Sequence, residues 1–205
     1  MHIAIIIITV AISLICFNNY ALFERLQLRP YVMVRQRQWD RIISHGFVHG
    51  SIAHLVINMF VLLSFGGVVF ETFKYLQSAG GMNANLNFNL LYFGGLIAAL
   101  IYDVIRYRNN PAFASIGASG AVAAVVFASI LYYPTGEILL FFIIPMPSWV
   151  FGLLYIVYES YSARHQRDHI NHHAHIFGAV FGFLYPVMIG GTGMFRHFLA
   201  QLGLW

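Results

Sequence analysis

Charged residues are scarce in this chain: only 9% of its 205 residues are Asp, Glu, Lys or Arg, against about a quarter in a typical soluble domain. Hydrophobic residues make up 60%, and the mean hydropathy is +0.73. This composition excludes an ordinary soluble protein and indicates a membrane protein. Because a spanning helix needs roughly 20 apolar residues, the chain has room for about six spans and none for a soluble domain.

Cysteine is also nearly absent, since Cys16 is the only one, and no intrachain disulfide can form. The first apolar run, 3–17, lacks a preceding basic segment and a small-residue cleavage site, which favours a retained helix over a signal peptide. The basic residues lie in connections, and no helix carries a basic face with interleaved aromatic residues. Nucleic-acid binding therefore has no support.

Apolar runs and their breaks predict six membrane-spanning helices in a single domain, residues 1–205. The spans lie roughly at 3–20, 51–73, 87–105, 114–133, 137–158 and 172–191. The longest connection, 21–50, mixes five arginines with aromatic residues, which is typical of a segment lying in the membrane interface. We therefore expect an all-α membrane protein, a six-helix bundle with an interfacial first loop.

Polar residues with catalytic potential lie near the start of the second, fourth and sixth spans. They are, in chain order, His54 and Asn58, then Ser119, then His175. Because successive spans run in opposite directions, these three spans begin at the same face of the bundle. The segmentation alone therefore predicts that the four side chains lie at a common depth. Polar groups inside a membrane are costly, so each one indicates function until explained otherwise.

Ser119 and His175 have the surroundings that an intramembrane hydrolase needs. Gly117 and Gly120 flank the serine, and Gly178 shares a helix face with the histidine, so two helices can approach closely. A neutral imidazole at such a contact can accept the serine proton as general base and return it to the leaving amine. Taken singly, each residue has an ordinary interpretation as a hydrogen-bonded side chain within a helix bundle.

Acyl transfer also needs hydrogen-bond donors directed at the oxyanion. His54 and Asn58, one helical turn apart, present a ring N–H and a side-chain amide on one face. The backbone N–H of Ser119 is a third candidate, because amides at a helix start lack intrahelical partners. His45 and His49, at the loop boundary, are expected only to hydrogen-bond the interfacial segment or to hold water.

No carboxylate is expected beside His175, and neither a metal nor another cofactor is expected in the site. The carboxylates of the spans each fall near a predicted helix end: Glu71, Asp103, Glu137 and Glu159. The sequence therefore predicts a serine–histidine dyad without a third member, its geometry held by helix packing.

Taken together, these motifs resemble those of the rhomboid intramembrane serine proteases. The resemblance covers nearly the whole chain. It rests on the six spans, His-x3-His-x4-His-x3-Asn at 45–58, Gly-Ala-Ser-Gly at 117–120, and Ala-His-x2-Gly-x3-Gly at 174–182. Arg41, four residues before the first of these motifs, matches an arginine in the family's first loop.

The resemblance implies Ser119 as nucleophile, His175 as general base, and His54 with Asn58 as oxyanion donors. It implies that the fifth helix and the loop 160–171 act as gate and cap for a single-span transmembrane substrate within the lipid bilayer. It further implies a bacterial inner-membrane protein whose active site faces away from the cytoplasm. No oligomeric state follows from the sequence.

Two features depart from the family pattern. Ala123 occupies the position one turn after Ser119 where the family commonly has an aromatic residue stacked on the histidine. Phe177 or another side chain must then support His175. Nine of the eleven basic residues also fall in loops on the predicted active-site face, so the positive-inside rule argues for the opposite membrane orientation.

Two other functions remain as alternatives. An inactive rhomboid-like scaffold would bind membrane proteins without cleaving them, although such relatives typically lack the serine or the histidine that this chain keeps. A metal or haem protein would use the histidines near the sixth span as ligands, and would leave Ser119 and its glycines unexplained. The sequence assigns no role to His165, His169, His172 and His173.

Overall fold

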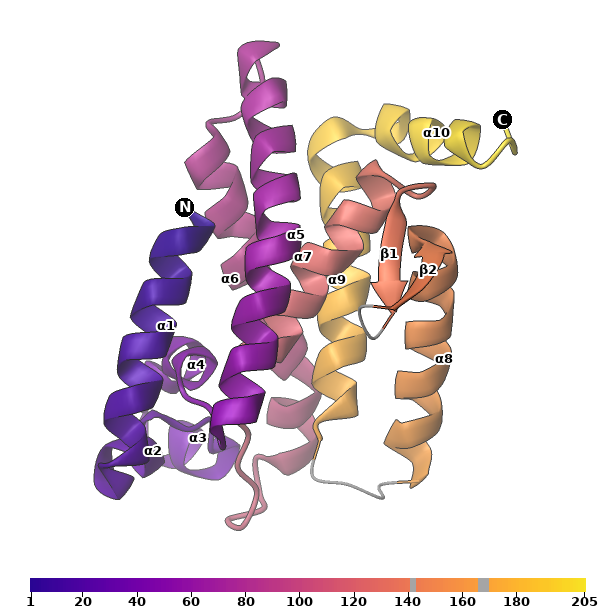
Figure 1. Ribbon diagram of the computed structural model, residues 1–205. Helices are drawn as coiled ribbons and strands as arrows, with labels where there is room; N and C mark the ends of the chain where they lie inside the picture. The colour runs from indigo at the N-terminus through magenta and orange to yellow at the C-terminus, as the bar shows by residue number, and fades with distance from the viewer. Residues whose placement is uncertain (141–142, 166–169) are drawn as a thin grey trace.

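The chain folds mainly into helices (Figure 1), as seen in a computed structural model that describes residues 1–140, 143–165 and 170–205. The six longest helices are α1 (His2–Phe17), α5 (Ile52–Ser78), α6 (Ala84–Tyr107), α7 (Ser119–Tyr132), α8 (Ser148–His165) and α9 (His172–Gly190). The shorter elements are α2 (Tyr20–Leu26), α3 (Pro30–Gln36), α4 (Arg41–Ser44), η1 (His45–Phe47), β1 (Glu137–Leu140), β2 (Ile144–Pro147) and α10 (Thr192–Gln201).

Within the described ranges, α5, α6 and α9 are long and apolar enough to cross a membrane. The helices α1 and α7 are apolar but shorter. The prediction of an all-helical membrane protein is therefore confirmed at the level of a predominantly helical chain with three candidate spans.

The predicted fifth span, 137–158, is wrong as a single helix. Its first half forms an antiparallel hairpin in which Glu137 lies opposite Pro147 and Leu140 opposite Ile144. Pro145 and Pro147 lack the N–H groups that a helix requires, and β-branched isoleucines around them favour strands. The helix consequently begins at Ser148 and extends to His165, seven residues beyond the predicted end.

Three smaller differences concern the connections. The fourth helix begins at Ser119, because the residues before it form a loop in which Ser115 pairs with Leu28 through two backbone hydrogen bonds of 2.9 and 3.0 Å. Residues 160–165 of the predicted cap loop belong to α8, and 166–169 lie outside the described residues. The helix α10 was not predicted, because its stretch is less apolar than the spans.

The helix α7 forms the centre of the bundle, with every residue from Gly120 to Tyr132 buried, and it packs against α5, α6 and α9. Small residues allow these helices to approach closely. A Cβ added at Gly178 would collide with the carbonyl of Gly120, and one added at Gly182 with the carbonyl of Ala124. The predicted glycine contact between the serine helix and the histidine helix is therefore present.

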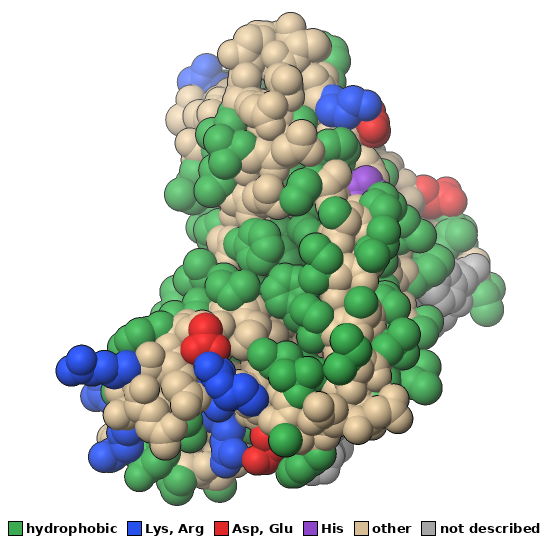
Figure 2. Space-filling view, turned by 90° about the vertical axis from the view of Figure 1, so that its left-hand side faces the viewer, with side chains coloured by type: hydrophobic (Ala, Val, Ile, Leu, Met, Phe, Trp, Pro, Cys, Tyr) green, Lys and Arg blue, Asp and Glu red, His purple; other side chains and the backbone are tan. Residues whose placement is uncertain are grey.

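As the alternation of direction predicted, α5, α7 and α9 all begin at the same end of the molecule, the lower end in Figure 1. The short helices α2, α3 and α4 lie at this end too. Basic side chains gather at this lower end of the molecule in Figure 2, and a few others lie at its upper end. The basic connection and the starts of the three helices therefore share one end of the bundle.

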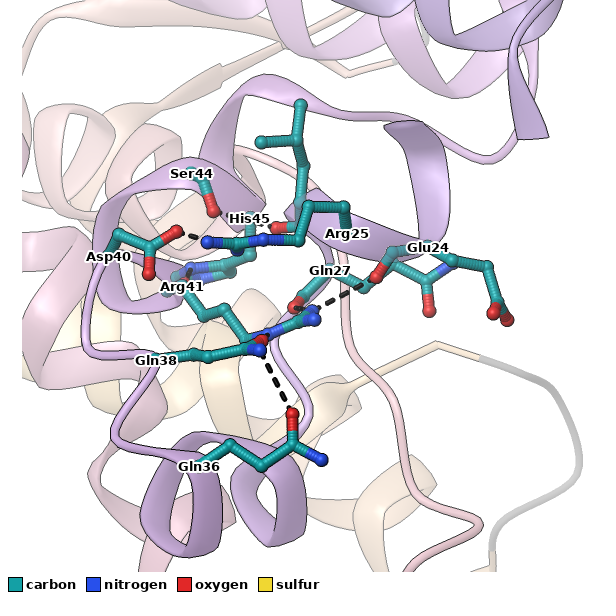
Figure 3. Close-up of polar contacts among 10 residues, drawn as sticks. Glu24, Arg25, Gln27, Gln36, Gln38, Asp40, Arg41, Ser44 and His45 are labelled. Carbon is teal, nitrogen blue, oxygen red and sulfur yellow. Dashed lines mark hydrogen bonds and ion pairs between the residues drawn. The ribbon is translucent and has the colours of Figure 1, made fainter. Parts of the chain in front are cut away.

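A buried arginine holds the basic connection together (Figure 3). Arg41, only 4% exposed, donates hydrogen bonds to the carbonyls of Glu24 (2.9 Å) and Gln27 (2.6 Å) and to the side chain of Gln38 (2.7 Å). Its own carbonyl is bonded by Nδ1 of His45 at 2.9 Å. This network ties α2 to α4 and fixes the backbone that leads to the first histidine motif.

Candidate active site

One cavity brings together the four residues that the sequence predicted to share a site. It measures about 1090 Å³, and Ser119, His175, His54 and Asn58 all line it. Apolar side chains of α5 and α8 form much of the remaining wall, among them Phe60, Val61, Phe65, Phe151 and Tyr155. In the part of the chain that the structure describes, no hydrogen bond joins Ser119 to His175. Catalytic hydrogen bonds often tighten only when substrate binds.

Gly117 gives the loop before Ser119 its shape. Its φ is +107°, a conformation that favours glycine, and a Cβ there would lie 2.8 Å from Cε1 of His54. The amide of Gly117 donates to the carbonyl of His45 at 2.9 Å. Both the backbone conformation and the contact with the His54 ring therefore require glycine at this position.

His49 completes the support of this loop, a more definite role than the sequence assigned to it. The hydroxyl of Ser13 donates to the carbonyl of Phe47 (2.8 Å), so Ser13 Oγ accepts the proton on His49 Nδ1 (3.0 Å). His49 Nε2 is then the unprotonated nitrogen and accepts the amide of Ala118 at 3.4 Å. Ser13, a polar residue on the buried face of α1, was missed by the sequence analysis.

His45 and His49 are held in the neutral form by burial, being 5% and 0% exposed. Burial lowers the pKa of His45 to about 4 and that of His49 to about 3. The His49 ring must stay neutral to accept the amide of Ala118 on Nε2. His45 supports the same loop through its backbone carbonyl, which accepts the amide of Gly117, while its ring bonds to the carbonyl of Arg41.

Acidification is expected to destabilise the fold through these two histidines. Their folded pKa values lie below the value of about 6.5 in an unfolded chain, so the folded state binds fewer protons. Stability is then complete above about pH 6.5 and falls as the pH drops towards 4, by up to about 1.4 kcal/mol per pH unit for each histidine. The check is the free energy of unfolding of detergent-solubilised protein, measured at several pH values from 7 to 4.5.

His49→Gln should reduce the slope of the free energy of unfolding against pH by about 1 kcal/mol per pH unit. The matched control is His197→Gln, which changes an exposed histidine of α10 and should leave the slope unchanged. Identical slopes for His49→Gln and the wild type would contradict the assignment.

Donors for an oxyanion converge on the cavity from two helices. The helix α7 begins at Ser119 without a side-chain cap, and its first amides carry the partial positive charge of a helix N-terminus. The side-chain nitrogen of Asn58 donates one hydrogen to the carbonyl of His54 at 2.9 Å, which leaves its second hydrogen for a ligand. His54 lies with its ring against Gly117.

A carboxylate contacts the predicted general base, contrary to expectation. Glu159 Oε1 lies 2.9 Å from Nδ1 of His175, and Glu159 Oε2 lies 2.6 Å from Nδ1 of His172. The prediction failed because the hairpin displaces α8 along the chain, which moves Glu159 from the end of the predicted span into the buried face of the helix. The detectable signal was an ionisable residue in an apolar stretch.

Tyr155, rather than Phe177, packs beside the His175 ring. The ring centroids of Tyr155 and His175 are 6.5 Å apart at an interplanar angle of 31°. Phe177 is 37% exposed and contacts Tyr102 instead. The small side chain of Ala123 leaves space on the side of α8. Tyr155 and Glu159, one helical turn apart on α8, are the residues that contact His175 there.

Among the described residues, the other histidines near the start of α9 contact different partners. His173 stacks on Tyr102 with ring centroids 3.8 Å apart, and His165 bonds the carbonyl of Tyr161 at 2.8 Å. His169 lies outside the described residues. Among the described residues, Glu159, His172 and His175 offer ligand atoms within 4.8 Å of one another, close enough for a metal ion, and both histidines hydrogen-bond to Glu159.

A second polar cluster connects the start of α9 to its neighbours. Asn171 caps α9 by accepting the amide of Ala174 at 3.2 Å. Its side-chain nitrogen donates to Asp103 of α6 (2.5 Å) and to Ser115 (3.0 Å). These bonds fix the start of α9, four residues before His175, relative to the loop that leads to Ser119.

Comparison with known proteins agrees with this arrangement. A family model described as "Rhomboid domain" matches residues 36–192. The chain is 28% identical over 67% of its length to "RHOMBOID-like protein 12, mitochondrial" of Arabidopsis thaliana, covering 43% of that protein. It is 30% identical over 70% of its length to "Rhomboid protein 1, mitochondrial" of Saccharomyces cerevisiae, covering 40% of that protein.

The chain thus spans less than half the length of these two relatives. Their names place both in mitochondria, so they give no support to the expected bacterial inner membrane. The family resemblance itself is confirmed, because the matched domain includes all three helix starts that line the cavity. This chain belongs to the rhomboid family.

Proposed function

We propose that this protein is an intramembrane serine endopeptidase that cleaves transmembrane segments of membrane proteins. The observation that carries the proposal is the convergence of Ser119, His175, His54 and Asn58 on one cavity at the uncapped start of α7. In this proposal α1, α5, α6, α7, α8 and α9 are the six helices of the membrane bundle.

The short length of α7 suits such a site. Its 14 residues extend about 21 Å, less than the roughly 30 Å of bilayer hydrocarbon. A helix shorter than the bilayer and buried by its neighbours can begin below the membrane surface. Ser119 would then meet a substrate within the membrane. The polar side chains that line the cavity would form hydrogen bonds with the water that hydrolysis requires.

In the proposed reaction, Ser119 Oγ attacks the carbonyl carbon of the scissile peptide bond. His175 takes the hydroxyl proton on Nε2, because Nδ1 already bonds to Glu159. The tetrahedral oxyanion accepts hydrogen bonds from the first α7 amides, Asn58 and His54. His175 then gives its proton to the leaving nitrogen as the C–N bond breaks, leaving an acyl ester on Ser119. Water, deprotonated by His175, attacks the ester carbonyl carbon. His175 then returns the proton to Ser119 Oγ as the bond between this oxygen and the acyl carbon breaks, which releases the new carboxyl terminus.

The apolar wall of the cavity indicates how a substrate would reach the serine. Phe60 and Phe65 of α5 face the same cavity as Phe151 and Tyr155 of α8. A transmembrane segment whose helix is weakened near the cavity could enter between α5 and α8 and present an extended peptide bond to Ser119. The helix α8, the fifth of the six proposed membrane helices, would then form one side of the substrate entrance.

The test is cleavage of a single-span substrate in liposomes, combined with labelling by a fluorophosphonate probe. Cleavage within the transmembrane segment and a covalent adduct on Ser119, located by mass spectrometry, are the expected results. Ser129, buried on the same helix and bonded to the carbonyl of Val126, is the internal control and should remain unlabelled. Substrate binding with neither cleavage nor labelling would instead favour a non-catalytic scaffold.

A further inference from the structure

We propose that Glu159 is a positioning residue for His175, so that this protein works with a serine–histidine–carboxylate arrangement whose acidic member lies on α8. The inference rests on the proposed protease function and deepens it. The residue that supports the general base then lies on α8, whereas the serine lies on α7 and the histidine on α9.

The neutral His175 ring carries its proton on Nδ1. A carboxylate can only accept, so the 2.9 Å contact between Glu159 Oε1 and His175 Nδ1 places a proton on Nδ1. The other nitrogen, Nε2, is then the basic one in the neutral ring. That tautomer is the one able to accept a proton from Ser119, and the carboxylate also stabilises the imidazolium that forms.

Glu159 is held firmly in place by burial and by hydrogen bonds. Its side chain is 5% exposed, and its second oxygen bonds to Nδ1 of His172, which is 4% exposed, at 2.6 Å. Two hydrogen bonds to two rings of the same helix leave Glu159 little freedom to rotate. A buried carboxylate without such partners would be energetically unfavourable. The two hydrogen bonds therefore favour a single orientation of the Glu159 side chain.

Ala123 occupies the position where the family resemblance implies an aromatic ring stacked on the histidine. Ala123, 5% exposed, cannot stack on His175. Tyr155 and Glu159, one turn apart on α8, together contact the ring and its Nδ1. These two residues provide the support from α8 that a side chain on α7 would otherwise provide.

The experiment compares Glu159→Gln, Glu159→Asp and the control Glu137→Gln, an exposed carboxylate in β1, with the wild type in liposomes. Glu159→Gln is expected to lower kcat by about 10²- to 10⁴-fold with KM changed less than about threefold, because substrate contacts are intact. Glu159→Asp should recover at least about tenfold of this loss, and Glu137→Gln should match the wild type.

A spectroscopic measurement tests the positioning without relying on turnover. In protein labelled with ¹⁵N-histidine, a downfield Nδ1–H proton resonance, assigned by its absence in His175→Ala, should be present in the wild type. It should be lost or moved upfield in Glu159→Gln. This readout also separates positioning from a general loss of folding, which thermal unfolding of each variant would report.

Retention of full kcat and of the downfield resonance by Glu159→Gln would overturn the inference, while the proposed protease function would stand if Ser119→Ala were inactive. Stoichiometric zinc in the active protein, with activity lost to a chelator and restored by zinc, would make Glu159 a metal ligand and overturn the positioning role. A wild type that cleaves nothing would defeat the proposed function, and the resonance would still decide whether Glu159 orients the ring.

Discussion

Replacing Ser119 by alanine is expected to lower kcat/KM for a transmembrane substrate by about 10³-fold or more. The change removes the oxygen that would form the acyl ester, and hydrolysis would then depend on direct attack by water with help from the oxyanion donors alone. The side chain of Ser119 has no hydrogen-bond partner among the described residues, so stability should change by less than about 0.5 kcal/mol. The measurement is the initial rate of cleavage in liposomes.

His175→Ala should cause a loss of similar size, and the double variant should be little slower than either single variant. This non-additivity is expected because the serine and its base act as one unit. Ser129→Ala is the matched control, since it removes a hydroxyl from the same helix, bonded at 2.7 Å to Val126, and should change the rate less than about threefold. Cleavage by Ser119→Ala at the wild-type rate would refute the nucleophile assignment.

The placement of the helix starts could be predicted from the sequence because it depends only on chain direction and helix length. Ser119, His54 and His175 each follow a polar connection and precede an apolar run, and these patterns are local. The close approach of α7 and α9 could also be inferred, since glycines at a spacing of four indicate a packed face. These features account for the cavity and for the residues around it.

The contact between Glu159 and His175 could not be predicted, because it depends on where the fifth helix begins. Hydropathy alone does not distinguish an apolar hairpin from the first half of a helix, and two prolines were needed to decide between them. The helix begins at Ser148, eleven residues after the predicted start of the span at residue 137, so the sequence did not indicate which residues of α8 face the cavity. The contact through which His49 supports the Ser119 loop could not be predicted for a similar reason, since it depends on Ser13, a residue 36 positions away.

Gly178→Ala is expected to lower the free energy of unfolding by about 3 kcal/mol and to reduce kcat/KM by at least about tenfold. The added methyl group would overlap the carbonyl of Gly120, and backbone atoms cannot move aside as a flexible side chain can, so the helices must separate. His175 lies one helical turn before Gly178, and Ser119 lies one residue before Gly120, the other partner in this contact. A displacement of about 1 Å between catalytic groups can lower the rate by about 10²-fold.

The control for this prediction is Gly193→Ala in α10, where an added Cβ meets nothing within 4 Å. That variant should match the wild type in both unfolding and cleavage. Measuring both properties for each variant separates the two consequences of the contact. If Gly178→Ala were as stable and as active as Gly193→Ala, the close approach of α7 and α9 could not be what holds His175 near Ser119. If only the rate fell, the contact would act mainly through the alignment of the two side chains rather than through the stability of the bundle.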